Sequence, residues 1–454
     1  MTLLDSNQAF VVRADEPGDC RQSLDLLFQR MGLPRENPLG AVLRPGQRVV
    51  VKPNLVFHRH YRGGSLDCLI TSPALIRAVC DRVFEAVGRQ GEVILGDAPL
   101  QSCDWNRLVT ETGLIQWPGQ YASQGYWLTL ADFRKFASTD LKGLKHSPIA
   151  RPGDPNGYRN VNLGANSLHA GRDWRRYRVT NYDPSEMLSH HNAGTHEYLI
   201  SGSVLSADAL ISLPKLKTHR KSGLTCALKN LIGINGSKDW LPHHMAGGTG
   251  EGGDEYPGRA AWKKLASWIV SREETAGRLG AKAALSATRR IVFKAGALLS
   301  GDARCEGSWQ GNDTLWRTIV DLNRIAVYAD KHGVMRSDPQ RSILTIVDAL
   351  VAGEGEGPMA PDPVPMGCLV GGFNPVAVEV AATRLAEWPE GQLRHLRGAF
   401  GLERFPLTAF RQSGVEVSSF PRPLCELSRF LRPPPGYAGL FSTAKPRRQE
   451  QVAV

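Results

Sequence analysis

The segments QRVVVKPNL, at residues 47–55, and TSPALIRAVCDRVFEAVGRQGEVILGD, at residues 71–97, decide the fold of this chain. The first contains an apolar run that is typical of a buried strand. In the second, Ser72 can cap a helix that starts at Pro73, apolar residues recur at helical spacing, and a new apolar run follows. A strand, a helix and a second strand in this order predict a parallel pair joined by a crossover helix. We therefore expect an α/β fold with a mostly parallel, Rossmann-like sheet flanked by helices.

The rest of the chain extends this pattern and suggests a domain organisation. Further strands are expected at residues 197–201, 205–213, 342–350 and 368–371, and a helix is expected from Asn374 to about Trp388. We expect an N-terminal segment at 1–44, an α/β core at 45–390 and a C-terminal extension at 391–454 with a disordered tail after Pro433. The core is expected to carry a loop- and β-rich insertion at 118–196 and a second insertion at 236–300, which is a Gly-rich loop followed by basic helices.

The segment LPKLKTHRKSGLTCALKNLIGING, residues 213–236, is the most informative for function. It directly follows an apolar run, and cations at the end of a buried strand are costly unless an anion meets them. Lysines, hydroxyls and backbone N–H groups bind phosphate or carboxylate. We therefore predict a site for a small anion; the candidate binding residues here and at the end of the first strand are Lys52, Asn54, Lys215, Lys217, Thr218, Lys229 and Asn230. A salt bridge is the alternative for each of them.

Carboxylates and histidines near the same strand ends suggest catalysis. Asp97, Asp348 and Glu354 are candidates for a general base or for ligands of a divalent metal, and His219 is the candidate proton-transfer residue. The candidate metal ligands are His243, His244 and Glu356. The Gly-rich loop that contains the two histidines is expected to be either a lid over the site or a flexible excursion.

Composition and missing motifs narrow the class of partner. The 454 residues carry a formal net charge of +11, which favours anionic partners. No nucleic-acid-binding motif, Walker pattern or GxGxxG after a strand is present, so neither a nucleic acid nor a nucleotide cofactor is expected. The eight cysteines include no CxxC pair, so no iron–sulfur cluster is expected. No apolar run approaches ~18 residues, and we expect a cytoplasmic protein without a transmembrane segment; the sequence leaves the oligomeric state open.

The helices expected at 259–300 leave a second kind of partner open. Trp262, Trp268 and Ile291 alternate there with basic residues such as Arg289 and Lys294. A basic amphipathic helix can lie on an anionic membrane, and a solvated face over the core is the alternative.

Several of these motifs together resemble a known family. They are VKPNL at 51–55, TSPALIRAV at 71–79, GDAP at 96–99, ALISLPKLKTH at 209–219, ALKNLIGINGSKDWLPHH at 227–244, VDALVAGEGEGP at 347–358 and NPVAVEVAATRL at 374–385. This set resembles the family named domain of unknown function 362 over about residues 45–390. Many members of that family carry a ferredoxin-type domain, and the lack of grouped cysteines places this chain with the members that do not. Asn374 and Glu379 stand where many relatives have aspartate, which weakens a metal site there.

Two further resemblances bear on function. The segment EGSWQGNDTLWRTIVDLNR, at 306–324, is similar to a subgroup linked with surface-polysaccharide or secondary-metabolite gene sets. His219, Gly223 and Lys229 resemble a pattern of the nickel-pincer lactate racemases, which implies that Lys229 would hold a cofactor and a histidine would manage a proton or hydride. We therefore expect an enzyme that acts on a small phosphorylated or carboxylated substrate. The alternatives are a non-catalytic accessory protein for polysaccharide assembly at a membrane and a racemase- or epimerase-like enzyme.

Overall fold

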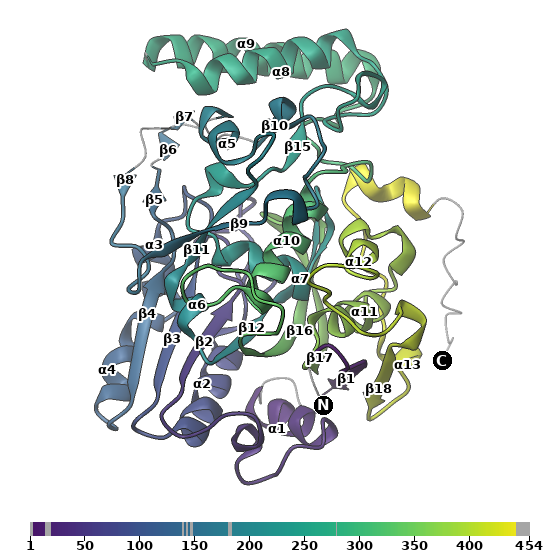
Figure 1. Cartoon of the computed structure of the whole chain (residues 1–454). Helices are drawn as coiled ribbons and strands as arrows, with labels where there is room; N and C mark the ends of the chain where they lie inside the picture. Colours follow the sequence, from purple (N-terminus) through teal and green to yellow (C-terminus); the bar gives the residue numbers. More distant parts are fainter. Residues whose placement is uncertain are drawn as a thin grey trace.

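A mixed sheet, drawn in the computed structural model of Figure 1, organises the chain. The structure describes residues 3–441, apart from 14–19, 139, 142–143, 146–148, 180–183 and 278. Within these residues the main sheet has ten strands in the order β18-β1-β17-β16-β12-β2-β3-β4, with β13 paired to β16 and β14 to β13. The strands are β1 (Gln8–Arg13), β2 (Arg48–Pro53), β3 (Glu92–Asp97), β4 (Trp127–Asp132), β12 (Ala209–Leu213), β13 (Lys215–His219), β14 (Gly223–Thr225), β16 (Ser342–Glu356), β17 (Ala360–Gly372) and β18 (Glu416–Phe420).

The block β16-β12-β2-β3-β4 is parallel throughout, and β17 runs antiparallel to both β16 and β1. Helices flank the sheet (Figure 1). They are α1 (Cys20–Arg30), α2 (Pro73–Val87), α3 (Trp105–Glu111), α4 (Trp117–Ala122), α5 (Pro184–His190), α6 (Gly202–Ser206), α7 (Ala227–Asn230), α8 (Ala261–Thr275), α9 (Leu279–Ser300), α10 (Leu315–Tyr328), α11 (Pro375–Leu385), α12 (Arg394–Gly398) and α13 (Leu424–Leu427). The predicted α/β class with a mostly parallel sheet is therefore confirmed.

Two apolar cores cover the two faces of the sheet, because alternate residues of a strand point to opposite sides. Val49 and Val51 of β2 join the core with α1 and α2, whereas Val50 joins the core with α10 and α11. All three valines are fully buried, as expected for parallel strands covered on both faces. This double burial explains the continuous apolar run that the sequence shows.

The range expected as a first insertion, 118–196, contains β4 of the main sheet, whereas the described elements of 236–300 lie outside that sheet. Residues 118–196 add the short strands β5 (Phe136–Ala137), β6 (Asp140–Leu141), β7 (Leu144–Lys145), β8 (Ile149–Ala150), β9 (Tyr158–Asn162) and β10 (Tyr177–Arg178). β9 pairs with β11 (Glu197–Ser201), and β10 pairs with β15 (His244–Met245). In the second insertion α8 and α9 form a helical hairpin at the top of Figure 1. Among the described helices none is sufficiently long and apolar to span a bilayer.

Three segments differ from their expected local structure. The strand expected at 342–350 is longer than expected, because β16 continues through the glycines and acids of 353–356, which pair with β17. Hydrogen bonds hold the Gly-rich loop in place. Its buried Asp254 accepts hydrogen bonds from the Thr314 hydroxyl at 2.6 Å and the Asp313 amide at 2.8 Å. The tail after Pro433 was expected to be disordered, but residues Pro435–Phe441 form the 3-10 helix η10, in which Tyr437 is buried. Residues 442–454 lie outside the described part.

Candidate functional site

The first buried ion pair lies where β2 and β3 end. Lys52 Nζ is 2.8 Å from Asp97 Oδ1, and the other Asp97 oxygen accepts the Leu55 amide at 2.7 Å. Lys52 also donates to the carbonyl of Pro53 at 2.9 Å and to Oδ1 of Asn230 at 3.1 Å. Burial lowers the pKa of Lys52, and the Asp97 carboxylate opposes that shift. An ammonium group has three donors, so Lys52 has none left for a ligand.

A second buried pair joins β13 to β16. Lys215 Nζ lies 3.0 Å from Asp348 Oδ2, and both side chains are almost fully buried. Asp348 also accepts the backbone amides of Ser72 at 2.7 Å and Leu350 at 3.0 Å. Neither residue of this pair lines the cavities described below. The pair thus fastens the start of α2 to the sheet.

Beside the first pair lies an inner cavity of about 110 Å³ into which other lysines point. Its lining includes Lys217 of β13, Lys229 of α7 and Lys238 of η6 (Lys238–Trp240). Lys217 donates to the carbonyl of Leu69, and Lys238 donates to that of Ile232 at 3.2 Å. Within the described part of the chain none of the three forms an ion pair with a carboxylate. Lys217 and Lys238 are buried and Lys229 is half-buried; Asp97, which pairs with Lys52, also lines the cavity and opposes the lowering of the Lys229 and Lys238 pKa values.

The surroundings of these lysines disfavour their charged forms. Burial is the main cause, and it lowers the pKa of Lys229 to about 8 and that of Lys238 to about 7. Burial, with the nearby Lys229 and Lys215, holds the pKa of Lys217 well below its usual value. A bound anion would supply the missing negative charge and raise all three pKa values. The inner cavity is therefore suited to an anion that binds together with protons.

Unpartnered oxygen atoms also line this cavity. Asn54 Oδ1 and Thr225 Oγ1 are buried and have no hydrogen-bond partner, and both residues belong to the lining. Buried polar atoms without partners are rare in native proteins, because each costs ~1–3 kcal/mol. A ligand with hydroxyl donors would satisfy them.

Two histidines with opposite hydrogen-bonding roles stand where the inner cavity meets a larger outer one. His219 Nδ1 accepts the amides of Lys221 at 3.0 Å and Ser222 at 3.2 Å, so its proton is assigned to Nε2. His243 Nδ1 instead donates to the carbonyl of Leu241 at 2.7 Å, which leaves a lone pair on Nε2. Burial lowers the pKa of His243 to about 3 and that of His219 well below its usual value, so both rings are neutral at pH 7. His219 can therefore donate a hydrogen bond through Nε2–H, and His243 can accept a hydrogen bond or a proton at Nε2.

The outer cavity has a volume of about 430 Å³ and is also basic. It shares Leu100, His219, His243 and Pro358 with the inner cavity, so these residues form the neck between the two. Its remaining polar lining is Arg62, Ser102, Arg220, Lys221 and Glu356. The inner cavity is smaller than the ~300 Å³ that drug-sized ligands need, whereas the outer one reaches that range. A ligand can therefore place a small anionic group inside and a larger moiety outside.

The remaining predicted residues lie around this site in different roles. Asn230 donates to the Lys52 carbonyl at 3.0 Å, Thr218 donates to the Gly355 carbonyl at 3.0 Å, and Glu354 accepts the Arg432 amide at 2.9 Å. Of the candidate metal ligands, His243 and Glu356 line the outer cavity and His244 lines neither. Across the described ranges, no three His, Cys, Asp or Glu side chains are grouped so that they could hold a metal ion.

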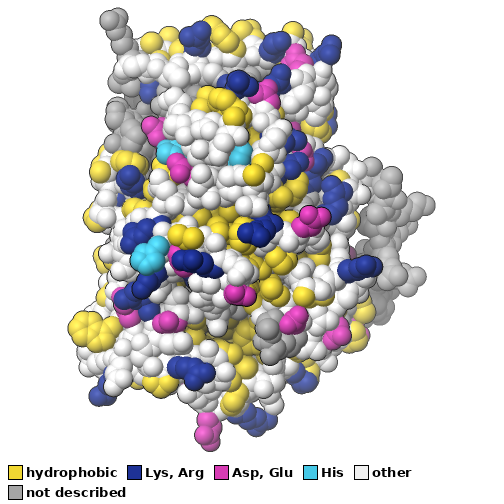
Figure 2. All heavy atoms as spheres, in the orientation of Figure 1, with side chains coloured by type: hydrophobic (Ala, Val, Ile, Leu, Met, Phe, Trp, Pro, Cys, Tyr) yellow, Lys and Arg dark blue, Asp and Glu magenta, His cyan; other side chains and the backbone are white. Residues whose placement is uncertain are grey.

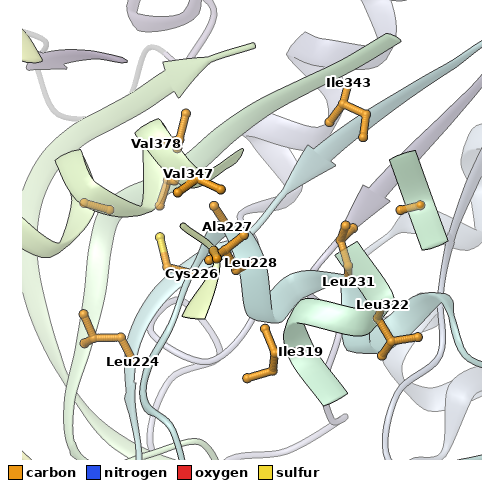
Figure 3. Packing of buried hydrophobic residues seen from close by; sticks show 14 of the residues in the cluster. Leu224, Cys226, Ala227, Leu228, Leu231, Ile319, Leu322, Ile343, Val347 and Val378 are labelled. Atoms are coloured by element: carbon orange, nitrogen blue, oxygen red, sulfur yellow. The ribbon is translucent and has the colours of Figure 1, made fainter. Parts of the chain in front are cut away.

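The segment that carries Lys229 is held by packing and by a buried carboxylate. Figure 3 shows Leu228 of α7 among apolar side chains of α10, α11 and β16, with Ile319 and Val378 nearby. Glu379 of α11 accepts the Leu228 amide at 2.9 Å and thereby anchors α7. The anchoring fixes Lys229 at the cavity.

Comparison with known proteins identifies one family. Residues 166–384 match the family described as "Domain of unknown function (DUF362)". This part of the chain is therefore similar to that family. The matched residues include Lys217, His219, Lys229, Lys238 and His243, whereas the β2–β3 part of the site precedes them. No curated protein matches the chain in sequence.

Two solved structures show a distant similarity to the chain. A crystal structure of a protein from Thermotoga maritima is 11% identical, with a TM-score of 0.34, and the match covers 85% of this chain and 59% of that one. The lactate racemase apoprotein from Thermoanaerobacterium thermosaccharolyticum is 10% identical, with a TM-score of 0.33, and the match covers 83% of this chain and 57% of that one. The chain thus spans less than two thirds of the length of either protein.

Sequence reasoning did not select Lys238 or Thr225 as site residues, and it placed His243 among the candidate metal ligands. Lys238 follows the segment LIGING, and the closeness of those glycines to the strand ends was the available signal. Gly233 lies so near the first pair that a Cβ there would come within 1.9 Å of Asp97 Oδ1. Only glycine allows this approach, which brings Lys238 to the cavity.

Proposed function

We propose that this protein is an enzyme that binds a small carboxylated or phosphorylated substrate in the inner cavity and transfers a proton on it. The observation that carries the proposal is the convergence of Lys217, Lys229 and Lys238 on one cavity, where none of them forms an ion pair with a carboxylate of the described residues. Charged groups in a partly buried cleft are costly, and a substrate anion would offset that cost. The lysines would hold the anionic group.

The two histidines supply the proposed chemistry at the neck. His243 Nε2 has the lone pair that could remove a proton from the bound substrate, and His219 Nε2–H could donate a hydrogen bond to the oxygen on which negative charge develops. Racemisation or epimerisation at a carbon next to the anionic group is one reaction that needs this arrangement. A non-catalytic accessory protein in polysaccharide assembly, the second candidate, would need the lysines but not the histidines; the exposed apolar side chains of the α8–α9 hairpin favour that candidate's membrane contact.

Titration calorimetry with inorganic phosphate, acetate and glycolate tests the anion site. We expect binding with proton uptake near pH 7.5, seen as a dependence of the heat on the ionisation enthalpy of the buffer. Lys229→Met should weaken binding at least ~10-fold, because a charge-assisted contact contributes about 1.5–3 kcal/mol. Lys264→Met, at an exposed lysine of α8, is the matched control and should bind like the wild type. Unchanged affinity in Lys229→Met would contradict the proposal.

A second experiment separates the enzyme from the binder. Solvent deuterium exchange into a bound carboxylic acid, followed by NMR, reports proton removal directly. His243→Gln should retain anion affinity within about two-fold but lose exchange by ~10²-fold or more, since a general base contributes ~10²–10⁴-fold. Equal exchange in both proteins, or none in the wild type with a full panel of bound acids, would favour the accessory protein.

A further inference from the structure

The α8–α9 hairpin has an apolar outer surface that the proposed function does not use. Trp268, Ile291, Leu298 and Leu299 are 55%, 69%, 85% and 87% exposed. Ile291 and Leu298 are seven residues apart and therefore share one face of α9. Figure 2 shows hydrophobic and basic side chains together along the upper margin of the molecule, where the hairpin lies in Figure 1. Large exposed apolar side chains gathered in this way mark interaction surfaces.

Side chains on the inner side of the hairpin already pack and form ion pairs with one another. Trp262 and Phe293 pack edge to face with ring centroids 5.9 Å apart. Glu273 pairs with Arg289 at 2.9 Å, and Asp302 pairs with Lys263 at 2.6 Å. The apolar core and the described acids of the hairpin are thus engaged internally, and what remains outside is apolar and basic.

Exposed cations border the apolar face. They are Lys264, Arg272, Arg290 and Lys294. Arg290 and Lys294 have no ion-pair partner within the described residues, and they flank Ile291 on α9. Lysine and arginine beside Trp and Leu form the pattern of helices that lie in the interface of an anionic bilayer.

We propose that the α8–α9 hairpin is a peripheral membrane-binding surface for bilayers rich in anionic phospholipid. Charge complementarity selects this occupant over a second copy of the chain. In a two-fold contact the same patch meets itself, so Arg290 and Lys294 would face the equivalent cations of the other copy. Lipid phosphates would instead pair with these cations while Trp268, Leu298 and Leu299 enter the boundary of the acyl chains. Because no described helix could span a bilayer, the contact is with the membrane surface.

Sedimentation of the full chain with vesicles tests the proposal. We expect binding to equimolar phosphatidylglycerol and phosphatidylcholine, little binding to phosphatidylcholine alone, and weaker binding at high salt. Arg290→Glu with Lys294→Glu should lower the partition coefficient at least ~10-fold, since each basic residue near an anionic surface contributes about 1 kcal/mol. The matched control is Arg44→Glu with Arg397→Glu, two exposed arginines outside the hairpin, and it should bind like the wild type.

A second variant tests the apolar part of the same surface. Leu298→Ser with Leu299→Ser should also weaken vesicle binding, and both positions are so exposed that folding should not change, as circular dichroism can verify. Absence of vesicle binding, or equal binding by the hairpin and control variants, would overturn the proposal. Concentration-dependent dimerisation that the leucine variant abolishes, without vesicle binding, would assign the surface to a second copy instead. Phosphate affinity is expected to stay unchanged in every hairpin variant, so this test is independent of the proposed anion site.

Discussion

The lysines near the strand ends form two groups. The groups differ in whether an aspartate carboxylate of the protein pairs with the lysine. Lys52 and Lys215 each face an aspartate at 2.8 and 3.0 Å. Lys217, Lys229 and Lys238 lie next to them and face a cavity. Burying a charge is unfavourable in both groups, but among the described residues only the first group has carboxylate partners. The difference separates lysines that hold the strands together from lysines that are available to a ligand.

The largest expected effect comes from breaking the buried ion pair between Lys215 and Asp348. Asp348→Ala leaves Lys215 as a buried charge and removes the acceptor for the Ser72 and Leu350 amides. We expect the free energy of unfolding to fall by about 3–5 kcal/mol, as measured by urea denaturation. The double variant Lys215→Met with Asp348→Leu should recover much of this loss, since it leaves no unpaired charge. A loss under ~1 kcal/mol in Asp348→Ala would place this lysine with the ligand-facing group.

A smaller effect is expected at the boundary between the two groups. In Gly233→Ala the new Cβ would lie 1.9 Å from Asp97 Oδ1 and 2.6 Å from Lys52 Nζ, so the pair must separate or the 3-10 turn at Leu231–Ile234 must shift. We expect a loss of about 2 kcal/mol, of the order found for overpacked buried sites. Gly391→Ala, at an exposed glycine with open space around it, is the control and should change stability by less than ~0.5 kcal/mol.

Removing a ligand-facing lysine should raise the free energy of unfolding rather than lower it. Lys229→Met deletes a buried charge that has no hydrogen bond to lose, and its lowered pKa shows that folding disfavours the charged form. We expect the apo protein to gain about 1 kcal/mol at pH 7, where this lysine is protonated in both states. Urea denaturation with and without inorganic phosphate measures the change. A destabilised apo variant would mean that Lys229 has a structural role like that of Lys52.

The smallest expected effect is a pH dependence. The pKa of Lys238 is about 7 and that of Lys229 about 8 in the folded protein, below the ~10.4 of the unfolded chain. Above these values the unfolded state binds more protons, so the stability of the apo protein should rise with pH, by on the order of 1 kcal/mol between pH ~6.5 and ~8. Phosphate affinity should fall over the same interval as the lysines lose charge.

The double variant Lys229→Met with Lys238→Met is the control for that pH dependence and should have a smaller slope, which Lys217 and Lys221, whose pKa values are also lowered, keep above zero. The interval ends near pH 8 because burial raises the pKa of several thiols, among them Cys103 to about 12. Thiols that ionise only in the unfolded chain lower stability at higher pH and would mask the lysines. A wild-type profile as flat as that of the variant would argue against lowered lysine pKa values.

Much of the fold followed from local sequence patterns. The predicted strand at 92–97 and the helix that starts at Pro73 are present as β3 and α2, because apolar periodicity and a proline at the first helical position act within one segment. The antiparallel return of β17 was harder to predict. Glycines and acids in GEGEGPM are typical of a loop, and pairing with residues 360–365 overrides that preference.

By itself, the sequence of this protein determined the parallel α/β core and the gathering of lysines, aspartates and histidines at the ends of its strands, since apolar runs place their polar neighbours at the edge of a parallel sheet. Only the tertiary structure decided which lysines are paired. Lys52 meets Asp97 and Lys215 meets Asp348 through the pairing of strands distant in sequence, whereas Lys217, Lys229 and Lys238 reach a cavity from three separate elements. Tertiary contacts also determine which face of the hairpin is exposed, because an amphipathic pattern does not predict which side the rest of the protein will cover.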